Sequence, residues 1–276
     1  MEGYAYYNGK IGPSSEISIP LTDRLIYFAD GVYDVIVGHH SKLFLEDEHM
    51  ERFFANMLFL GIQPPLSKQK IKEAIHKLID FSKYESYLIY VSASRNSHQR
   101  THSYLHSNGT NLLITVKKFE MSCEDDVKLT IEEDMRYKYC NIKTTNLLPA
   151  VLAATKAECK GCDEAIFIRN ETITECSHSN IFIANKDEIV THPASAFILS
   201  GIIRGFIIKS AAELGIKAAE RTFTVDELFS ADEIFITSTT KLIRGVASIN
   251  GVSVGNKNPA LIQKIKSYAL NSYNQI

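Results

Sequence analysis

Lys143 stands in the segment NIKTTNLLPAVLAATKA (residues 141–157), where polar residues lead into an apolar, alanine-rich stretch. A lysine in a short polar segment is usually a solvated surface charge. The flanking sequences YKYCNI and NLLPAVLAA instead indicate a largely buried neighbourhood. A buried lysine loses its proton more easily, and the neutral amine forms a Schiff base with a carbonyl compound. Lys143 is therefore a candidate catalytic amine.

A carboxylate and two groups of possible phosphate ligands follow Lys143 along the chain. Glu175 precedes a Ser/His/Ser/Asn cluster after a predicted strand, where it could hold a cationic ring nitrogen or occupy an exposed turn. Ser200 and Gly201 precede an apolar helix, whose first turn either binds an anion or is an ordinary cap. The hydroxyl run at 237–240 ends another strand and suits either phosphate oxygens or a plain turn.

Arg52 lies beside the apolar face of the first long predicted helix and could supply a guanidinium to a phosphate. Glu48, four residues earlier, offers an ordinary surface ion pair instead. An amine, an acid for a ring nitrogen and a phosphate cradle are together what pyridoxal phosphate requires. The residue types therefore predict a pyridoxal 5'-phosphate site.

Hydrophobic periodicity indicates the elements that position these residues. The segment EDEHMERFFANMLFLGI predicts a helix that ends at Gly61, and the Asn-Gly pair of YAYYNGKI predicts a hairpin. Further helices are expected at 68–82, 148–159, 202–214, 225–229 and 258–272, and strands at YLIYVSAS, NLLITVKKF, 128–133, EAIFI, SNIFIAN, DEIV, EIFIT and 245–254. This mixture predicts an α+β protein with two unequal domains, residues 1–120 and 121–276.

Composition restricts the class of partner. The 276 residues include 30 basic and 32 acidic ones, a net charge of −2, which provides no basic surface for nucleic acid or membrane. No apolar run reaches the ~18 residues of a membrane helix, and MEGYAYYNGK has no signal-peptide pattern. We expect a cytoplasmic protein whose partners are small molecules or copies of itself.

The cysteines predict neither a disulfide framework nor a metal site. There are five of them, an odd number. The pair in CKGC (159–162) has no second pair of ligands, so the motif is interpreted as a helix end with Gly161 at its cap.

Over nearly its whole length the chain resembles the class IV, or fold type IV, pyridoxal-phosphate aminotransferases. This group includes D-amino acid and branched-chain aminotransferases and aminodeoxychorismate lyases. The matching segments, in the family's order, are DRLIYFADGVYDVI, EHMERFFAN, IKTTNLL, GCDEAIFIRNETITECSHSNIF, THPASAFILSGIIR and ITSTT. The resemblance implies a smaller N-terminal α/β domain, a larger C-terminal pseudo-barrel domain, a cofactor in the cleft between them, and a homodimer.

The resemblance also implies roles for individual residues. Lys143 corresponds to the Schiff-base lysine, which carries a proton between the substrate Cα and C4′ of the cofactor. Glu175 corresponds to the partner of the pyridine nitrogen, and Arg136 resembles an arginine near the phenolic oxygen. The other implied cofactor ligands are Arg52 on the phosphate, Leu199 on a cofactor face, the backbone of Ile202 and Ile203, and the hydroxyls of Ser238 and Thr239.

One part of the pattern resembles the D-amino acid enzymes of the family. They bind the substrate carboxylate with a tyrosine of a DGVY segment and an Arg-x-His pair, on a loop that reaches across the dimer interface. This chain has Tyr33 in ADGVY, and Arg100 and His102 in HQRTH. A phenol, a guanidinium and an imidazole can all donate hydrogen bonds to a carboxylate. Without the resemblance, the same segment could be a solvated loop.

The implied activity is transamination of a D-alanine-like D-amino acid with a 2-oxo acid acceptor. Two alternatives remain: a branched-chain L-aminotransferase and an aminodeoxychorismate lyase, which eliminates pyruvate. Cys176 after the glutamate also occurs in lyase relatives, and Ile203 replaces a threonine of the phosphate cup. A non-catalytic cofactor-binding protein would have no use for the carboxylate-binding residues. His178 and Pro149 are further departures from the family pattern.

Overall fold

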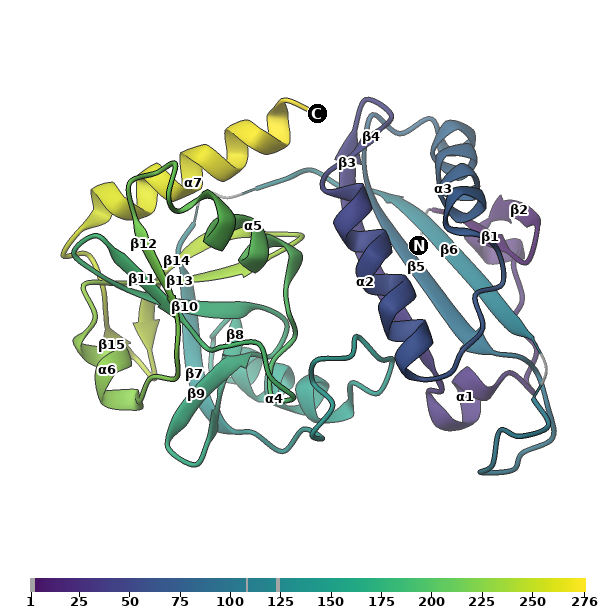
Figure 1. The fold of residues 1–276 in the computed structure, drawn as a ribbon, viewed down its shortest axis with the longest axis horizontal. Helices are drawn as coiled ribbons and strands as arrows, with labels where there is room; N and C mark the ends of the chain where they lie inside the picture. The colour runs from purple at the N-terminus through teal and green to yellow at the C-terminus, as the bar shows by residue number, and fades with distance from the viewer. Residues whose placement is uncertain (1–2, 108, 123–124) are drawn as a thin grey trace. The chain divides into compact units, whose positions relative to one another are not determined.

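A computed structural model describes residues 3–107, 109–122 and 125–276, so Cys123 lies outside the described residues. These residues form two units, each built around its own sheet (Figure 1). The first contains the described residues up to Glu120 together with Ile142–Asn146 and Ile276. The second contains Met121–Asn141 and Leu147–Gln275.

The sheet of the first unit comprises, within the described residues, six antiparallel strands in the order β2-β1-β6-β5-β3-β4. Their bounds are β1 (Tyr4–Tyr7), β2 (Lys10–Pro13), β3 (Gly31–His39), β4 (Lys42–Leu43), β5 (Ser86–Arg95) and β6 (Thr110–Lys118). Asn8 and Gly9, both with positive φ, connect β1 to β2 and confirm the predicted hairpin.

Two helices bury one face of this sheet. α2 (Glu46–Phe59) and α3 (Lys68–Ser82) insert Met50, Phe53, Ile71 and Ile75 into a core that includes the sheet residue Ile89. Both helices were expected from their apolar periodicity and are confirmed. A short 3-10 turn (Ser14–Glu16) and the five-residue helix α1 (Arg24–Phe28) precede β3; neither is predicted by periodicity, because each is shorter than two helical turns.

The second unit has a curled mixed sheet of nine strands within the described part of the chain, in the order β12-β11-β10-β13-β14-β7-β8-β9, with β15 on β14 (Figure 1). The strands are β7 (Val127–Glu133), β8 (Glu164–Arg169), β9 (Thr172–Cys176), β10 (Asn180–Asn185), β11 (Glu188–Thr191), β12 (Lys217–Glu220), β13 (Glu233–Ser238), β14 (Leu242–Ile249) and β15 (Val252–Ser253). The helices are α4 (Leu148–Cys159), α5 (Ile202–Ser210), α6 (Val225–Ser230) and α7 (Pro259–Asn274).

Residues 142–146 depart from the expected division at residue 120, which places them in the second domain. In the structure they belong to the first unit because their backbone pairs with the start of β3. The amide of Tyr33 donates to the carbonyl of Lys143 at 3.0 Å, and the amide of Thr145 donates to the carbonyl of Gly31 at 3.1 Å. Lys143 is thereby held directly on β3.

Helix α4 has the predicted bounds but not the predicted burial. Ala153 and Ala157 are its buried residues, whereas Leu148 is 66% exposed and Leu152 is 56% exposed. Pro149 does not interrupt the helix, because it occupies the first turn, where no amide hydrogen is needed. Gly161, with φ +70°, follows the helix end as expected. Helix α5 ends at Ser210 instead of the expected 214.

In the part of the chain that the structure describes, no helix combines the length and apolar character needed to cross a membrane.

Candidate active site

Lys143 lies over an aromatic ring of the first unit. Its Nζ is 4.5 Å from the ring centroid of Tyr33, a cation–π distance, and the Tyr33 ring in turn stacks on Tyr90 with centroids 5.2 Å apart. Lys143 is half-buried. The structure therefore brings the predicted catalytic lysine together with the tyrosine predicted to bind the substrate carboxylate.

Arg52 is held by a buried carboxylate of β3. Its Nε and one terminal nitrogen donate to the two oxygens of Asp34 at 2.9 and 2.8 Å, a bidentate pair. The Asp34 side chain is fully buried, and that of Arg52 is 11% exposed. The sequence offered Glu48, four residues earlier, as an ion-pair partner of Arg52. In the structure Arg52 pairs instead with Asp34, which is 18 positions away. Asp34 thus fixes the guanidinium predicted to bind the phosphate.

His49 completes this buried group. Its Nδ1 lies 2.7 Å from Asp34 Oδ1, and both side chains are fully buried. Burial alone would raise the pKa of Asp34, but the charges and hydrogen bonds of Arg52 and His49 lower it below its ordinary value. Burial lowers the pKa of His49, and the positive charges of Arg52 and Lys143 lower it further. The imidazole is therefore neutral and donates its Nδ1 proton to Asp34.

Arg100 and His102 meet on one aromatic side chain of α1. The guanidinium carbon of Arg100 lies 5.5 Å from the ring centroid of Phe28, and the His102 ring lies 5.4 Å from it. Arg100 also lies 6.0 Å from the ring centroid of Tyr27. The two residues predicted to bind a carboxylate are thus neighbours in space, while Tyr33 lies with Tyr90 and Lys143.

Glu175 lies inside strand β9 and not after it, as the sequence suggested, and three elements converge on its carboxylate. Oε1 accepts from Arg136 at 2.5 Å. Oε2 accepts from the side-chain amide of Asn180 at 2.9 Å and from the backbone amide of Leu199 at 3.1 Å. Glu175 is 5% exposed. A carboxylate oriented by three donors is suited to hold a positively charged ring N–H.

Arg136, predicted to lie near a phenolic oxygen, is itself tightly held. Its Nε donates to Asp134 at 2.9 Å, and its guanidinium carbon lies 4.3 Å from the ring centroid of Phe167. Burial alone would raise the pKa of Asp134, but the hydrogen bonds and charge of Arg136 lower it. Arg136 therefore remains cationic and balances the negative charge of Glu175.

Asn180 connects Glu175 to the predicted phosphate-binding residues. Besides Glu175, its side-chain amide donates to the carbonyl of Leu199 at 2.8 Å. A Cβ at Gly201 would meet the Asn180 Oδ1 at 2.0 Å, so glycine is required for this approach. Asn180 also pairs with Thr237 in the ladder between β10 and β13. The end of β13 and the start of α5 therefore meet at Asn180.

This arrangement fits a phosphate group. Gly201 begins α5 without a side-chain cap, so the amides of Ile202 and Ile203 in the first turn point out of the helix start. The hydroxyls of Thr237 and Ser238 are buried and, among the described residues, have no hydrogen-bond partner. Buried hydroxyls without partners cost free energy unless a ligand satisfies them. Thr239 follows in the half-buried turn after β13.

The sequence did not single out Asp34 and Asn180, which orient residues of this site, or Arg24, which donates to the backbone of the loop that carries Arg100 and His102. Asp34 could have been noticed as an acid inside the apolar strand sequence VYDVIV, where a charge needs a partner. Asn180 stood at the end of the polar cluster after Glu175. Arg24, which is buried in α1, carried no signal in the sequence.

A separate cluster surrounds the fully buried Glu164 of β8. Its Oε1 accepts from Lys241 Nζ at 2.6 Å and from Ser179 Oγ at 2.8 Å, and it lies 3.1 Å from His178 Nε2. Burial raises the pKa of the neighbouring Cys176 thiol, so that it stays protonated. The two departures from the family pattern after Glu175 are thus a buried thiol and a histidine that contacts Glu164.

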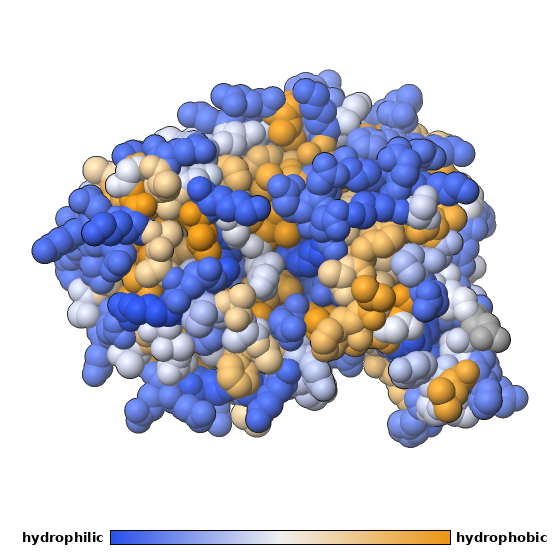
Figure 2. Space-filling view, in the orientation of Figure 1, coloured by the Kyte–Doolittle hydropathy of each residue, from blue (hydrophilic) through white to orange (hydrophobic). Residues whose placement is uncertain are grey.

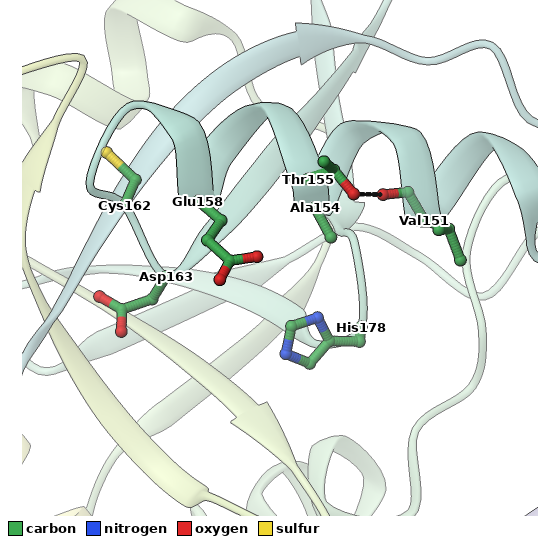
Figure 3. Close-up of a pocket in the computed structure, with 7 residues that line it drawn as sticks. All are labelled: Val151, Ala154, Thr155, Glu158, Cys162, Asp163 and His178. Carbon is green, nitrogen blue, oxygen red and sulfur yellow. Dashed lines mark hydrogen bonds between the residues drawn. The ribbon is translucent and has the colours of Figure 1, made fainter.

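His178 also lines a pocket of about 490 Å³ beside α4. In Figure 3 its imidazole lies below helix α4, on the side towards which the Glu158 carboxylate points, while Asp163 lies farther along, near the end of the helix. The full lining is Val151, Ala154, Thr155, Glu158, Cys162, Asp163 and His178. This lining includes none of the residues predicted to bind cofactor or substrate.

Comparisons with known proteins identify the family of this chain. The family model for amino-transferase class IV matches residues 31–249. The chain is 34% identical to D-alanine aminotransferase of Bacillus licheniformis over 267 residues, which is 96% of this chain and 94% of that protein. It is also 34% identical to D-alanine aminotransferase of Staphylococcus aureus (strain MSSA476) over 255 residues, 91% of this chain and 90% of that protein.

The fold has close counterparts among solved structures. The branched-chain amino acid aminotransferase from Thermobaculum terrenum, in its PLP-bound form, superposes with a TM-score of 0.86 at 22% sequence identity, over 100% of this chain and 95% of that chain. At this identity the likeness concerns the fold, and it confirms the expected fold type IV architecture. Because the family model spans most of the sequence and the relatives are a third identical over nearly its whole length, this chain belongs to the class IV aminotransferase family of pyridoxal-phosphate-dependent enzymes.

Proposed function

We propose that this chain transfers the amino group of a D-amino acid, D-alanine or one similar to it, to a 2-oxo acid. The observation that carries the proposal is the pairing of Arg100 and His102 on Phe28, which gathers two donors suited to a carboxylate. The D-alanine aminotransferases that are 34% identical to the chain support the same substrate class.

In this proposal the substrate carboxylate is bound by Tyr33 of one copy and by Arg100 and His102 from the loop of a second copy, as the resemblance to the D-amino acid enzymes implies. Arg100 supplies a permanent positive charge and a planar pair of donors, while the imidazole and the phenol each add one donor. Binding the carboxylate at a fixed point orients the Cα–H bond relative to the catalytic base. The chirality of the amino acid then decides whether its Cα–H bond faces the catalytic base.

Pyridoxal phosphate, when bound, supplies an electron-withdrawing ring that makes the substrate Cα–H acidic. Lys143 holds the cofactor through its aldehyde. The free amine of Lys143 would then be the base that takes the proton from the substrate Cα and returns it on the cofactor side. Glu175, oriented by Arg136, Asn180 and the Leu199 amide, keeps the ring nitrogen protonated.

We further propose that the phosphate is held by the first-turn amides of α5, by Ser238 and Thr239, and by Arg52. Asp34 presets the Arg52 guanidinium, so little side-chain entropy is lost when the phosphate binds. Ile203 contributes its backbone amide only, which leaves the neighbouring hydroxyls of β13 to take a larger share of the phosphate oxygens.

The first test is a visible absorption spectrum of the cofactor-loaded protein before and after D-alanine alone, with L-leucine as the comparison. We expect D-alanine, and not L-leucine, to convert the band of the lysine-bound cofactor to that of the aminated cofactor. Conversion by L-leucine alone would contradict the proposal and favour a branched-chain aminotransferase. Release of pyruvate from aminodeoxychorismate without an amino acceptor, and no response to either amino acid, would favour the lyase.

A matched variant tests the role of Lys143. Lys143→Ala removes the proton carrier, and the rate of transamination should fall by about 10²–10⁴-fold or more. Normal turnover by this variant would refute the assignment.

We also propose that the chain acts as a homodimer. The first unit exposes large apolar side chains, including Leu58 (78%) and Phe59 (56%) at the end of α2 and Leu105 (81%) in the loop with Arg100. Figure 2 shows apolar surface over the part of this unit where α2 runs. Exposed apolar surface of this kind is typical of a protein interface. Sedimentation equilibrium showing a monomer at micromolar concentration would contradict the proposal.

A further inference from the structure

Arg24 is a buried arginine whose guanidinium reaches the loop that carries Arg100 and His102. It is 3% exposed. Its two terminal nitrogens donate to the backbone carbonyls of Thr101 at 2.7 Å and His102 at 3.1 Å. Its Nε donates to Asp30 at 2.8 Å. One side chain therefore binds the backbone of two successive loop residues.

The loop of residues 96–107 needs such an anchor because its backbone forms no hydrogen bonds of a helix or a sheet. Residues 96–107 contain neither helix nor strand, so their backbone groups must find other partners. Within this segment, Thr101 Oγ1 donates to the carbonyl of Ser103 at 3.0 Å, a bond that is local to the loop. The amide of His98 donates to the carbonyl of Thr22 at 3.1 Å, and Arg24 adds two bonds at the Arg-x-His segment itself.

The same guanidinium sits on the aromatic ring shared by the two predicted carboxylate ligands. The guanidinium carbon of Arg24 lies 4.6 Å from the ring centroid of Phe28, the ring on which Arg100 and His102 also lie. Two guanidinium groups and an imidazole thus share one aromatic residue, and the two guanidinium groups gain cation–π interaction with it. Arg24 thus holds the loop backbone at Thr101 and His102, and Phe28 orders the side chains of Arg100 and His102.

Arg24 is itself rigidly placed. Asp23 caps α1 through the amide of Leu25 at 2.8 Å and accepts from Ser94 of β5 at 3.0 Å and Asn111 of β6 at 2.7 Å. Asp30 pairs with Arg24 and also accepts from Arg95 Nε at 3.0 Å. The central strands therefore determine where α1 places the Arg24 guanidinium.

We infer that Arg24 is a positioning residue for substrate binding, which holds Arg100 and His102 at the spacing that recognises a carboxylate. The inference rests on the proposed function, because it concerns the same carboxylate site. This role needs the planar guanidinium of an arginine, because three N–H donors must reach the Thr101 and His102 carbonyls and the Asp30 carboxylate at once. Lysine, with one nitrogen on a flexible stem, cannot reproduce this geometry.

The test compares Arg24→Lys and Arg24→Met with the wild-type protein, all loaded with cofactor. The probe is propionate, which has the carboxylate of D-alanine without its amine, and its dissociation constant is measured by isothermal titration calorimetry. Loss of two charge-assisted hydrogen bonds should weaken propionate binding by about tenfold or more in both variants. The KM for D-alanine should rise in parallel, with kcat and the visible cofactor band nearly unchanged.

Leu78→Ala is the matched control for general destabilisation. Leu78 is a buried residue of α3 in the core of the same unit, so its truncation lowers the thermal midpoint without removing any contact of the loop backbone. We expect this variant to bind propionate within about twofold of wild type.

The outcomes separate the inference from the proposed function. Wild-type propionate affinity in Arg24→Met, or an equal loss in Leu78→Ala, would overturn the positioning role while leaving the proposed activity standing. A wild-type protein that binds propionate but does not respond to D-alanine would overturn the proposed substrate alone. A wild-type protein that fails to bind propionate would overturn the carboxylate site and this inference with it.

Discussion

Replacing Asp34 by asparagine tests the buried group formed by Asp34, His49 and Arg52. The substitution keeps the volume of the side chain, so it creates no cavity. It removes the negative charge and turns one acceptor into a donor, which then faces the Nε–H of Arg52 or the terminal N–H. Arg52, whose side chain is 11% exposed, loses the carboxylate charge of its bidentate partner.

Removal of one partner from a buried ion pair typically lowers the free energy of unfolding by about 3–5 kcal/mol. The lower end applies if Arg52 can rotate towards water, and the upper end if the surrounding core holds it in place. The assay is urea denaturation of the cofactor-free protein at pH 7.5, followed by circular dichroism, so that cofactor binding adds nothing to the difference. A loss below about 1 kcal/mol would refute the view that this pair organises the first unit.

A control and a pH series sharpen this test. Asp47→Asn makes the same chemical change in an exposed pair with Lys72 and should leave the unfolding midpoint nearly unchanged. The folded state lowers the pKa of Asp34, so its contribution to stability is complete above the pKa of the unfolded chain, 3.8, and is lost as the pH falls further. The difference between wild type and Asp34→Asn should therefore shrink below about pH 4. A difference that grows on acidification would contradict the assignment.

Three further outcomes are expected. Gly201→Ala should lower the free energy of unfolding by about 1–3 kcal/mol, because its Cβ would meet the Asn180 Oδ1 at 2.0 Å. Gly205→Ala, with open space around its Cβ, should not destabilise the protein. Equal effects of the two substitutions in urea denaturation would refute this expectation. Ser238→Ala should weaken cofactor binding about tenfold in an absorbance titration, since a buried hydroxyl loses its phosphate partner, and an unchanged dissociation constant would exclude that role. His49 should titrate below its ordinary pKa of 6.5 in an NMR experiment, so its contribution to stability is lost as the pH falls below that value, and a midpoint at or above 6.5 would be inconsistent with a neutral imidazole.

The local features of this protein could be predicted from the sequence. The bounds of α3 and α4 and the Asn-Gly hairpin follow from periodicity, caps and turn residues that are close together in the chain. The class of chemistry could be predicted in the same way. An amine, an acid and hydroxyl groups at strand and helix ends each indicate a chemical role by residue type, without knowledge of their partners in space. The order of the matching segments then indicated the family.

The partners of these residues were decided only by the tertiary structure. Arg52 binds Asp34 and not the nearby Glu48, and Asn180 joins Glu175 to the start of α5, because strand register and helix packing bring distant side chains together. Spacing along the chain carries no information about such contacts. The alanine-rich helix α4 shows the reverse case, since its apolar residues indicated burial but the fold covers one face of it with β8 and leaves Leu148 and Leu152 exposed.

Lys143 combines both levels. Its residue type and its neighbours in NIKTTNLL determined that it could be a catalytic amine. Its attachment to β3 and its position over Tyr33 depend on backbone pairing between segments more than a hundred residues apart, as in the bond from Tyr33 to the Lys143 carbonyl. The sequence determined which groups are present, and the tertiary structure determined which of them meet, because hydrogen bonds and ion pairs depend on distances in space that chain separation does not specify.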